Sequence, residues 1–102
     1  MNKRNIREVH DTHLRKPEIA AEYINQALES EDQAVIIMAI RNVVNAQEGG
    51  ITRISERAHL GRESMYKMLS VNGNPKLNSL TGLLHSLGLK LRVEAEKTTS
   101  HS

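Results

Sequence analysis

The choice of apolar side chains most constrains the fold of this chain, because nearly all of them are aliphatic. The sequence contains no Cys, Trp or Phe, and its two tyrosines are its only aromatic residues. Disulfides, cysteine nucleophiles and cysteine-bound zinc are therefore excluded. A single-strand RNA reader is disfavoured, because such proteins usually stack bases on aromatic side chains. The 102 residues suit a single domain with an aliphatic core.

The spacing of apolar residues predicts a first amphipathic helix over residues 17–29. Pro17 stands at a favourable first-turn position, and Glu18 lies near the positive end of the helix dipole. Five apolar residues then recur with the spacing of one helical face: Ala20, Tyr23, Ile24, Ala27 and Leu28.

The apolar pattern predicts two further long helices. Residues 34–40 are all apolar, which alone would also fit a buried strand. Because Val43 and Val44 continue the pattern with helical spacing, we predict a central helix over 33–47 that is buried almost all round. A leucine stripe predicts a last helix that ends at Gly88: Leu77, Leu80, Leu83, Leu84 and Leu87.

Residues 89–96 alternate apolar and polar side chains, which predicts a half-buried C-terminal β-strand. Leu89, Leu91 and Val93 lie on its apolar side, and its edge would pair with a second copy of the chain or with a partner protein. Within the chain, only the segment around Ile6 and Val9 offers a pairing alternative. We therefore expect a flexible arm over 1–16, one mostly helical domain over 17–96 and a polar tail over 97–102.

Charged residues are segregated along the chain. Residues 17–50 carry one Arg and six acidic residues, a net charge of −5, and residues 51–92 carry seven basic and two acidic residues, a net charge of +5. A basic unit of this size is typical of a surface that faces a polyanion, although uneven charge also occurs on solvated faces of other proteins.

Residues 51–70 have the pattern of a helix-turn-helix. Thr52 is placed to cap the first helix, the small Ala58 lets the two helices approach closely, and Leu60 anchors the turn. Met65, Met68 and Leu69 form the buried side of the second helix, which leaves long polar side chains exposed near its start. A recognition helix needs this arrangement, because its N-terminal residues read base edges in the major groove. A helical hairpin inside a bundle would have a similar pattern.

Five stretches carry a resemblance to a known family: residues 17–28, 50–58, 60–70, 73–75 and 87–92. Together they resemble HigA-type addiction-module antitoxins and related prophage regulators with a lambda-repressor-like, Xre-class helix-turn-helix. The resemblance implies an all-α fold of five helices, here with one short C-terminal β-strand. It also implies a protein that binds double-stranded operator DNA, represses its own operon and neutralises a RelE/HigB-like toxin. Because helix-turn-helix proteins of this type read two half-sites, we expect a homodimer, and a cytoplasmic location is the default for a chain without a signal-peptide pattern.

The same resemblance implies DNA contacts from both helices of the motif. Thr52 and Arg53 would contact the DNA backbone, and the contacts from the recognition helix would come from Arg62, Glu63, Tyr66 and Lys67. Three positions depart from the family's pattern. His59 replaces the usual Gly of the turn and must tolerate a left-handed conformation, and Gly61 replaces the usual Ser cap. Lys76 stands at a capping position but cannot accept a hydrogen bond, so the last helix should start imperfectly or at Asn78.

The sequence offers little support for other functions. His10, Asp11 and His13 resemble part of a metal site, but no further ligand of suitable spacing lies nearby in the sequence. We therefore predict a protein that is not an enzyme and has no metal and no cofactor. The basic N-terminus has no apolar stretch behind it, so we expect no signal peptide. The alternative function is a protein–protein interaction module, toxin-binding or scaffolding, that binds no operator DNA, since the acidic residues 17–50 would attract a basic toxin.

Overall fold

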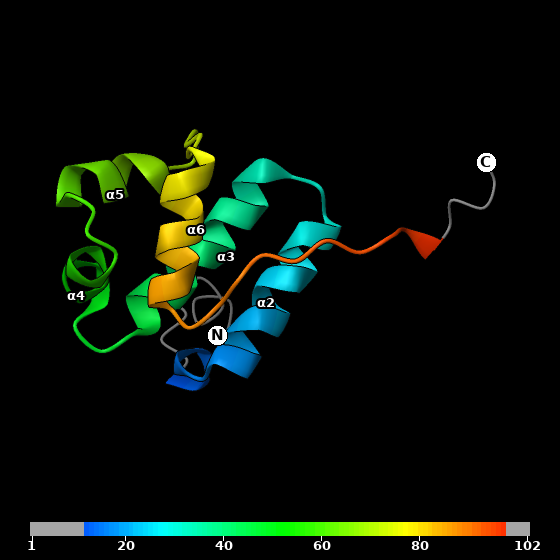
Figure 1. Cartoon of the computed structure of the whole chain (residues 1–102), viewed down its shortest axis with the longest axis horizontal. Coiled ribbons are helices and arrows are strands. Elements are labelled where there is room, and N and C mark those ends of the chain that lie inside the picture. The colour runs from blue at the N-terminus through cyan, green and yellow to red at the C-terminus, as the bar shows by residue number, and fades with distance from the viewer. Residues whose placement is uncertain (1–11, 98–102) are drawn as a thin grey trace, which may run out of the picture.

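The computed structural model describes residues 12–97, and it is helical apart from turns and an extended C-terminal segment (Figure 1). Its elements are the 3-10 helix η1 (Thr12–Arg15) and the α-helices α2 (Pro17–Glu29), α3 (Gln33–Ala46), α4 (Gly50–Arg57), α5 (Arg62–Met68) and α6 (Leu77–Ser86). The predicted all-α character and the three long helices are confirmed.

Helix α3 lies at the centre of the aliphatic core and packs against η1, α2 and α4. Val43 and Val44 have no exposed surface, and the helix also buries Ile37, Ala39, Ile40 and Ala46. Asp32 caps its first turn by accepting a hydrogen bond from the Ala34 N–H at 3.0 Å. We predicted that this helix is buried on almost every side, which is wrong, because Val35 is 43% and Met38 49% exposed. Helix α3 therefore keeps one solvent-facing side.

The predicted C-terminal strand at 89–96 is wrong, because the first of these residues completes the end of α6. Gly88 has a left-handed φ of 81°, its N–H donates to the His85 carbonyl at 2.9 Å, and the Leu89 N–H donates to the Leu84 carbonyl at 2.8 Å. This pair of bonds is a Schellman cap, and it commits Leu89 to the helix end. The residues after Leu89 run past the core with no strand beside them within residues 12–97. Ile6 and Val9 lie outside the described residues.

Residues 12–15 fold onto the end of α3, although we predicted them within a flexible arm. Leu14 is 2% exposed and joins the core. The Arg15 Nε donates to the Ala46 carbonyl at 2.6 Å, and the Gln47 Nε2 donates to the Leu14 carbonyl at 3.0 Å. Each of these two side chains thus donates to a backbone carbonyl that has no partner within a helix, Ala46 at the end of α3 and Leu14 in η1. The packed part of the chain thus begins before Pro17.

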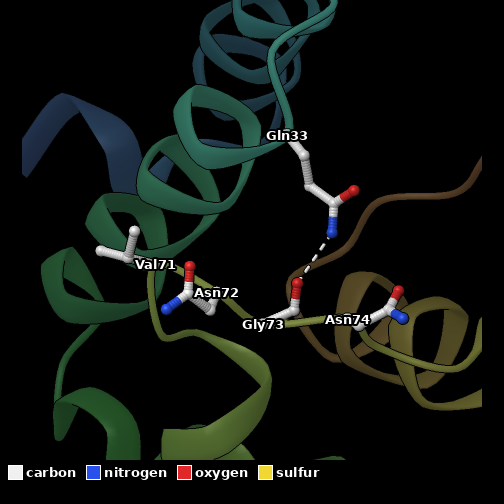
Figure 2. Close-up of a pocket in the computed structure, with 5 residues that line it drawn as sticks. All are labelled: Gln33, Val71, Asn72, Gly73 and Asn74. Carbon is white, nitrogen blue, oxygen red and sulfur yellow. Dashed lines mark hydrogen bonds between the residues drawn. The ribbon is translucent and has the colours of Figure 1, made fainter.

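The loop between α5 and α6 is fixed to the start of α3 (Figure 2). The Gln33 Nε2 donates to the Gly73 carbonyl at 2.7 Å, a bond that joins residues 40 positions apart. Gly73 is buried, and its N–H donates to the Ser70 carbonyl at 2.8 Å. A Cβ atom at this position would overlap the carbonyl oxygen of Met68. Only glycine lets the loop pass this close to the C-terminal end of α5.

We predict that Gly73→Ala lowers the free energy of unfolding by about 1–3 kcal/mol, because the new methyl group meets backbone that cannot move aside. Chemical denaturation followed by circular dichroism measures the change. Gly82→Ala is the matched control, since a Cβ built there meets no heavy atom within 4 Å other than its chain neighbours and the backbone of its own helix. In the α6 interior this control should be neutral or stabilising by up to about 1 kcal/mol. Equal unfolding free energies for the two variants would contradict the steric account.

Candidate nucleic-acid interface

Helix α4 begins about one turn before the start that we predicted from Thr52 as its cap. Gly49 is its N-cap residue with a left-handed φ of 83°, and the helix starts at Gly50, so Thr52 lies inside the first turn rather than capping it. Ile54 is 1% exposed and fixes α4 to the core. The Ser55 hydroxyl, which is also buried, donates to the Thr52 carbonyl at 2.9 Å. Thr52 and Arg53 remain exposed on the outer side of the helix.

The turn between α4 and α5 is a Schellman cap with histidine at the left-handed position. His59 has φ 59°; its N–H donates to the Glu56 carbonyl at 3.2 Å, and the Leu60 N–H donates to the Ser55 carbonyl at 2.9 Å. Leu60 packs half-buried against the core, as predicted. The expectation that His59 adopts the left-handed conformation is therefore confirmed. Gly61 follows as the N-cap residue of α5, with an extended backbone.

Helix α5 buries one side and presents the other to solvent. Met65, Met68 and Leu69 are 0%, 7% and 4% exposed, so they fix the orientation of the helix against the core. Arg62, Glu63, Tyr66 and Lys67 are all exposed, with Tyr66 at 55%. Helix α5 packs on α4 at the edge of the molecule (Figure 1). The six residues expected to contact DNA thus all have solvent-accessible side chains on these two neighbouring helices.

Helices α4 and α5 carry four exposed basic residues, whereas Lys90 and Arg92 lie on the segment after α6 that begins beside Pro17 of α2. All seven basic residues between 51 and 92 are exposed: Arg53, Arg57, Arg62, Lys67, Lys76, Lys90 and Arg92. Two of them, Lys67 and Lys76, line one open groove of about 280 Å³ together with polar side chains that include Ser64, Asn74 and Ser79. The groove joins the exposed side of α5 to the start of α6.

Lys76 is a candidate contact that we did not predict from the sequence. It is the N-cap residue of α6, and its side chain accepts no bond from the first turn, so the helix starts at Leu77 without a side-chain cap. The imperfect start of α6 was expected. The proximity of Lys76 to Lys67 was not, because it depends on how the 69–76 loop folds. The sequence did contain a signal for this contact, namely a lysine at the capping position of α6. The free N–H groups at a helix start and an ammonium group both favour a bound anion such as a phosphate.

The remaining predicted site residues have different surroundings. Leu89 is half-buried and packs on the core, whereas Leu91 is 48% and Val93 94% exposed. His10 and Asp11 lie outside the described residues; among residues 12–97, no three His, Cys, Asp or Glu side chains are grouped to hold a metal ion. No helix within the same range is long and apolar enough to cross a membrane.

Comparison with known proteins identifies the family. A family model described as "probable addiction module antidote protein" matches residues 7–95, most of the chain. The chain belongs to this family of addiction-module antidotes. An uncharacterized protein of Haemophilus influenzae is 27% identical over 85 residues, which cover 83% of this chain and 86% of that protein. No solved structure gives a significant match. Membership assigns the chain the role of an antitoxin, a role that implies a toxin as its partner and is generally not enzymatic.

The left-handed turn residue gives a prediction for stability. His59 is exposed, so replacing it removes strain without removing buried contacts. We expect His59→Gly to raise the free energy of unfolding by up to about 1 kcal/mol, because glycine adopts a positive φ without steric cost. His59→Val should lower it by more than about 1 kcal/mol, since β-branched residues disfavour this conformation most. Thermal unfolding of both variants tests the turn, and the reverse order of stabilities would contradict it.

Proposed function

We propose that this antitoxin binds double-stranded operator DNA of its own operon through α4 and α5, as a homodimer, and neutralises a RelE/HigB-like toxin of a type II module. The main support is the two-sided character of α5. Its apolar side chains are buried against the core, and every side chain expected to face DNA is polar or charged and exposed. A helix held in this way presents side chains to the major groove in a fixed orientation.

The exposed residues of α5 supply the chemistry for reading bases. Arg62 and Lys67 can donate to the O6 and N7 acceptors of guanine, and Glu63 can accept from the amino group of cytosine. Tyr66, one turn after Arg62, has a phenolic hydroxyl that can bond to a base edge or a phosphate. All four lie within the first two turns of a short helix, Arg62–Met68. Since this helix has only seven residues, the four side chains extend along nearly its whole length and support major-groove recognition by α5 as a whole.

Residues on both sides of α5 suit phosphate contacts. Thr52 and Arg53 lie near the start of α4, and Lys76 lines the groove that leads from α5 to α6. Phosphate contacts fix the register of a protein on DNA without reading its sequence. We propose that these residues contact phosphates of the two DNA strands that border the major groove.

The dimer follows from how helix-turn-helix proteins bind. Such proteins read two half-sites about one DNA turn apart, so each protomer contributes one recognition helix. Leu91 and Val93 are exposed apolar side chains outside the motif, and we assign them to the contact with a second copy. No paired strand is needed for this contact, since the two side chains can bury against apolar residues of the other protomer.

We expect Arg62→Ala and Lys67→Ala each to weaken operator binding by about 1–3 kcal/mol where the lost contact is to a base. The melting temperature should stay nearly unchanged, because both side chains are exposed. Fluorescence anisotropy with the duplex upstream of the chain's own reading frame gives both affinity and salt dependence. Log affinity should fall steeply with log salt, and less steeply for any variant that loses a phosphate contact.

A variant with the same loss of charge elsewhere controls for net charge. Lys16→Ala with Arg41→Ala removes two exposed positive charges that lie outside α4 and α5. This control should bind the operator almost as tightly as the wild type. Operator binding that survives the double replacement of Arg62 and Lys67, or that the control loses equally, would rule out α5 as the recognition helix.

A further inference from the structure

We infer that the exposed side of the α2–α3 pair is the surface on which this chain binds a basic protein, its toxin. The inference rests on the proposed function, in which the antitoxin has a protein partner as well as DNA. It proposes where on the molecule this partner binds. Neither the family membership nor the helix-turn-helix indicates that surface.

A side-chain hydrogen bond joins the exposed edges of the two helices. The Asn42 Nδ2 of α3 donates to the Tyr23 hydroxyl of α2 at 2.8 Å, and both residues are half-buried. Ile19 lies one turn before Tyr23, and Met38 lies one turn before Asn42. Because residues four apart share a helix face, the Ile19 and Met38 side chains lie along the same joined surface.

This joined surface exposes three large apolar side chains. Ile19, Val35 and Met38 are 38%, 43% and 49% exposed, and Val35 lies three residues before Met38 on the same face of α3. Interfaces between proteins are enriched in aromatic residues and Met at their buried centre. Met38 and the half-buried Tyr23 therefore form a suitable anchor region for a partner.

Acidic residues border the apolar strip. Exposed acidic side chains occur along α2 and in its connection to α3: Glu18, Glu22, Glu29, Glu31 and Asp32. Arg41, the only basic residue between 17 and 50, lies three residues after Met38 on the same side of α3, and the exposed acidic residues of this surface outnumber it five to one. A surface with this charge repels nucleic acid and attracts a positively charged protein, which specifies the chemistry of the partner. A toxin that acts on RNA needs a basic surface of its own, so its charge complements this face.

The position of α2 permits both partners to bind together. Helix α2 packs against η1 and α3, whereas α5 packs against α4, and α2 and α5 lie on opposite sides of the central helices (Figure 1). A protein seated on α2 and the exposed side of α3 would leave Arg62 and Lys67 accessible. The acidic face binds the toxin, and the basic face binds the operator.

The test uses the purified product of the reading frame adjacent to this chain's gene as the probe. Isothermal titration calorimetry measures its affinity for the full chain and for two surface variants, Met38→Asp and the pair Glu18→Lys with Glu22→Lys. We expect each variant to weaken the complex at least tenfold, because one inserts a charge among the anchors and the other reverses the charge of the border. Met38→Asp should melt like the wild type because Met38 is exposed. The glutamate pair should melt slightly below it, since Lys in the first turn of α2 opposes the helix dipole.

A charge-matched pair separates this surface from net charge. Glu48→Lys with Glu56→Lys makes the same change in charge at two exposed positions outside α2 and α3. This control should bind the probe within about threefold of the wild type, and Met38→Asp should keep full operator binding. Equal losses for the control and the surface pair would overturn the inference.

Other outcomes distinguish the inference from the function on which it rests. A complex that neither surface variant weakens would place the toxin elsewhere and overturn only the inference. No complex between the probe and the wild-type chain would overturn both the antitoxin pairing and the surface. Surface variants that dissociate a dimer of this chain but leave toxin affinity unchanged would assign the face to a second copy and also overturn the inference.

Discussion

Burial of α3 is the constraint on which the rest of the structure depends. With no Trp, Phe or Cys, the chain stabilises its core through closely packed aliphatic side chains, and Val43 and Val44 lie fully buried within it. Both ends of α3 also hold other segments by hydrogen bonds. Gln33 at its start holds the loop after α5, and Ala46 at its end accepts from Arg15 of η1. Because α4 packs on α3 and α5 packs on α4, the orientation of the candidate recognition helix depends on this central helix.

Most of the helical fold could be predicted from residue spacing, and the errors have identifiable physical causes. The alternation at 89–96 predicted a strand, but Gly88 allows a left-handed cap that uses the Leu89 N–H, and alternation supplies no pairing partner. Residues 12–15 escaped prediction because a single buried residue, Leu14, produces no periodicity. The run at 34–40 concealed the exposed side of α3, since seven consecutive apolar residues do not show which of them face solvent. Only packing distinguishes the exposed Met38 from the buried Ile40.

The candidate sites differ in how far the sequence revealed them. The recognition-helix residues could be chosen from the sequence, because the buried positions Met65, Met68 and Leu69 leave only one side of α5 for solvent. The groove shared by Lys67 and Lys76, and the surface joined by the Tyr23–Asn42 bond, depend on contacts between separate elements. In the proposed account, an acidic surface on α2 and α3 binds a protein, and a separate basic surface on α4 and α5 binds DNA. Each surface is then free to bind its partner independently.

Nuclear magnetic resonance of the uniformly ¹⁵N-labelled chain, titrated with the duplex upstream of its own reading frame, tests the DNA-binding claim most directly. The account predicts the largest amide shift changes in α5, Arg62–Met68, with smaller changes around Thr52, Arg53 and Lys76. The α2 amides should stay nearly unchanged, and a scrambled duplex should give weaker changes that vanish as salt is raised. Changes centred on α2, or equal responses to the two duplexes, would contradict sequence-specific recognition through α4 and α5.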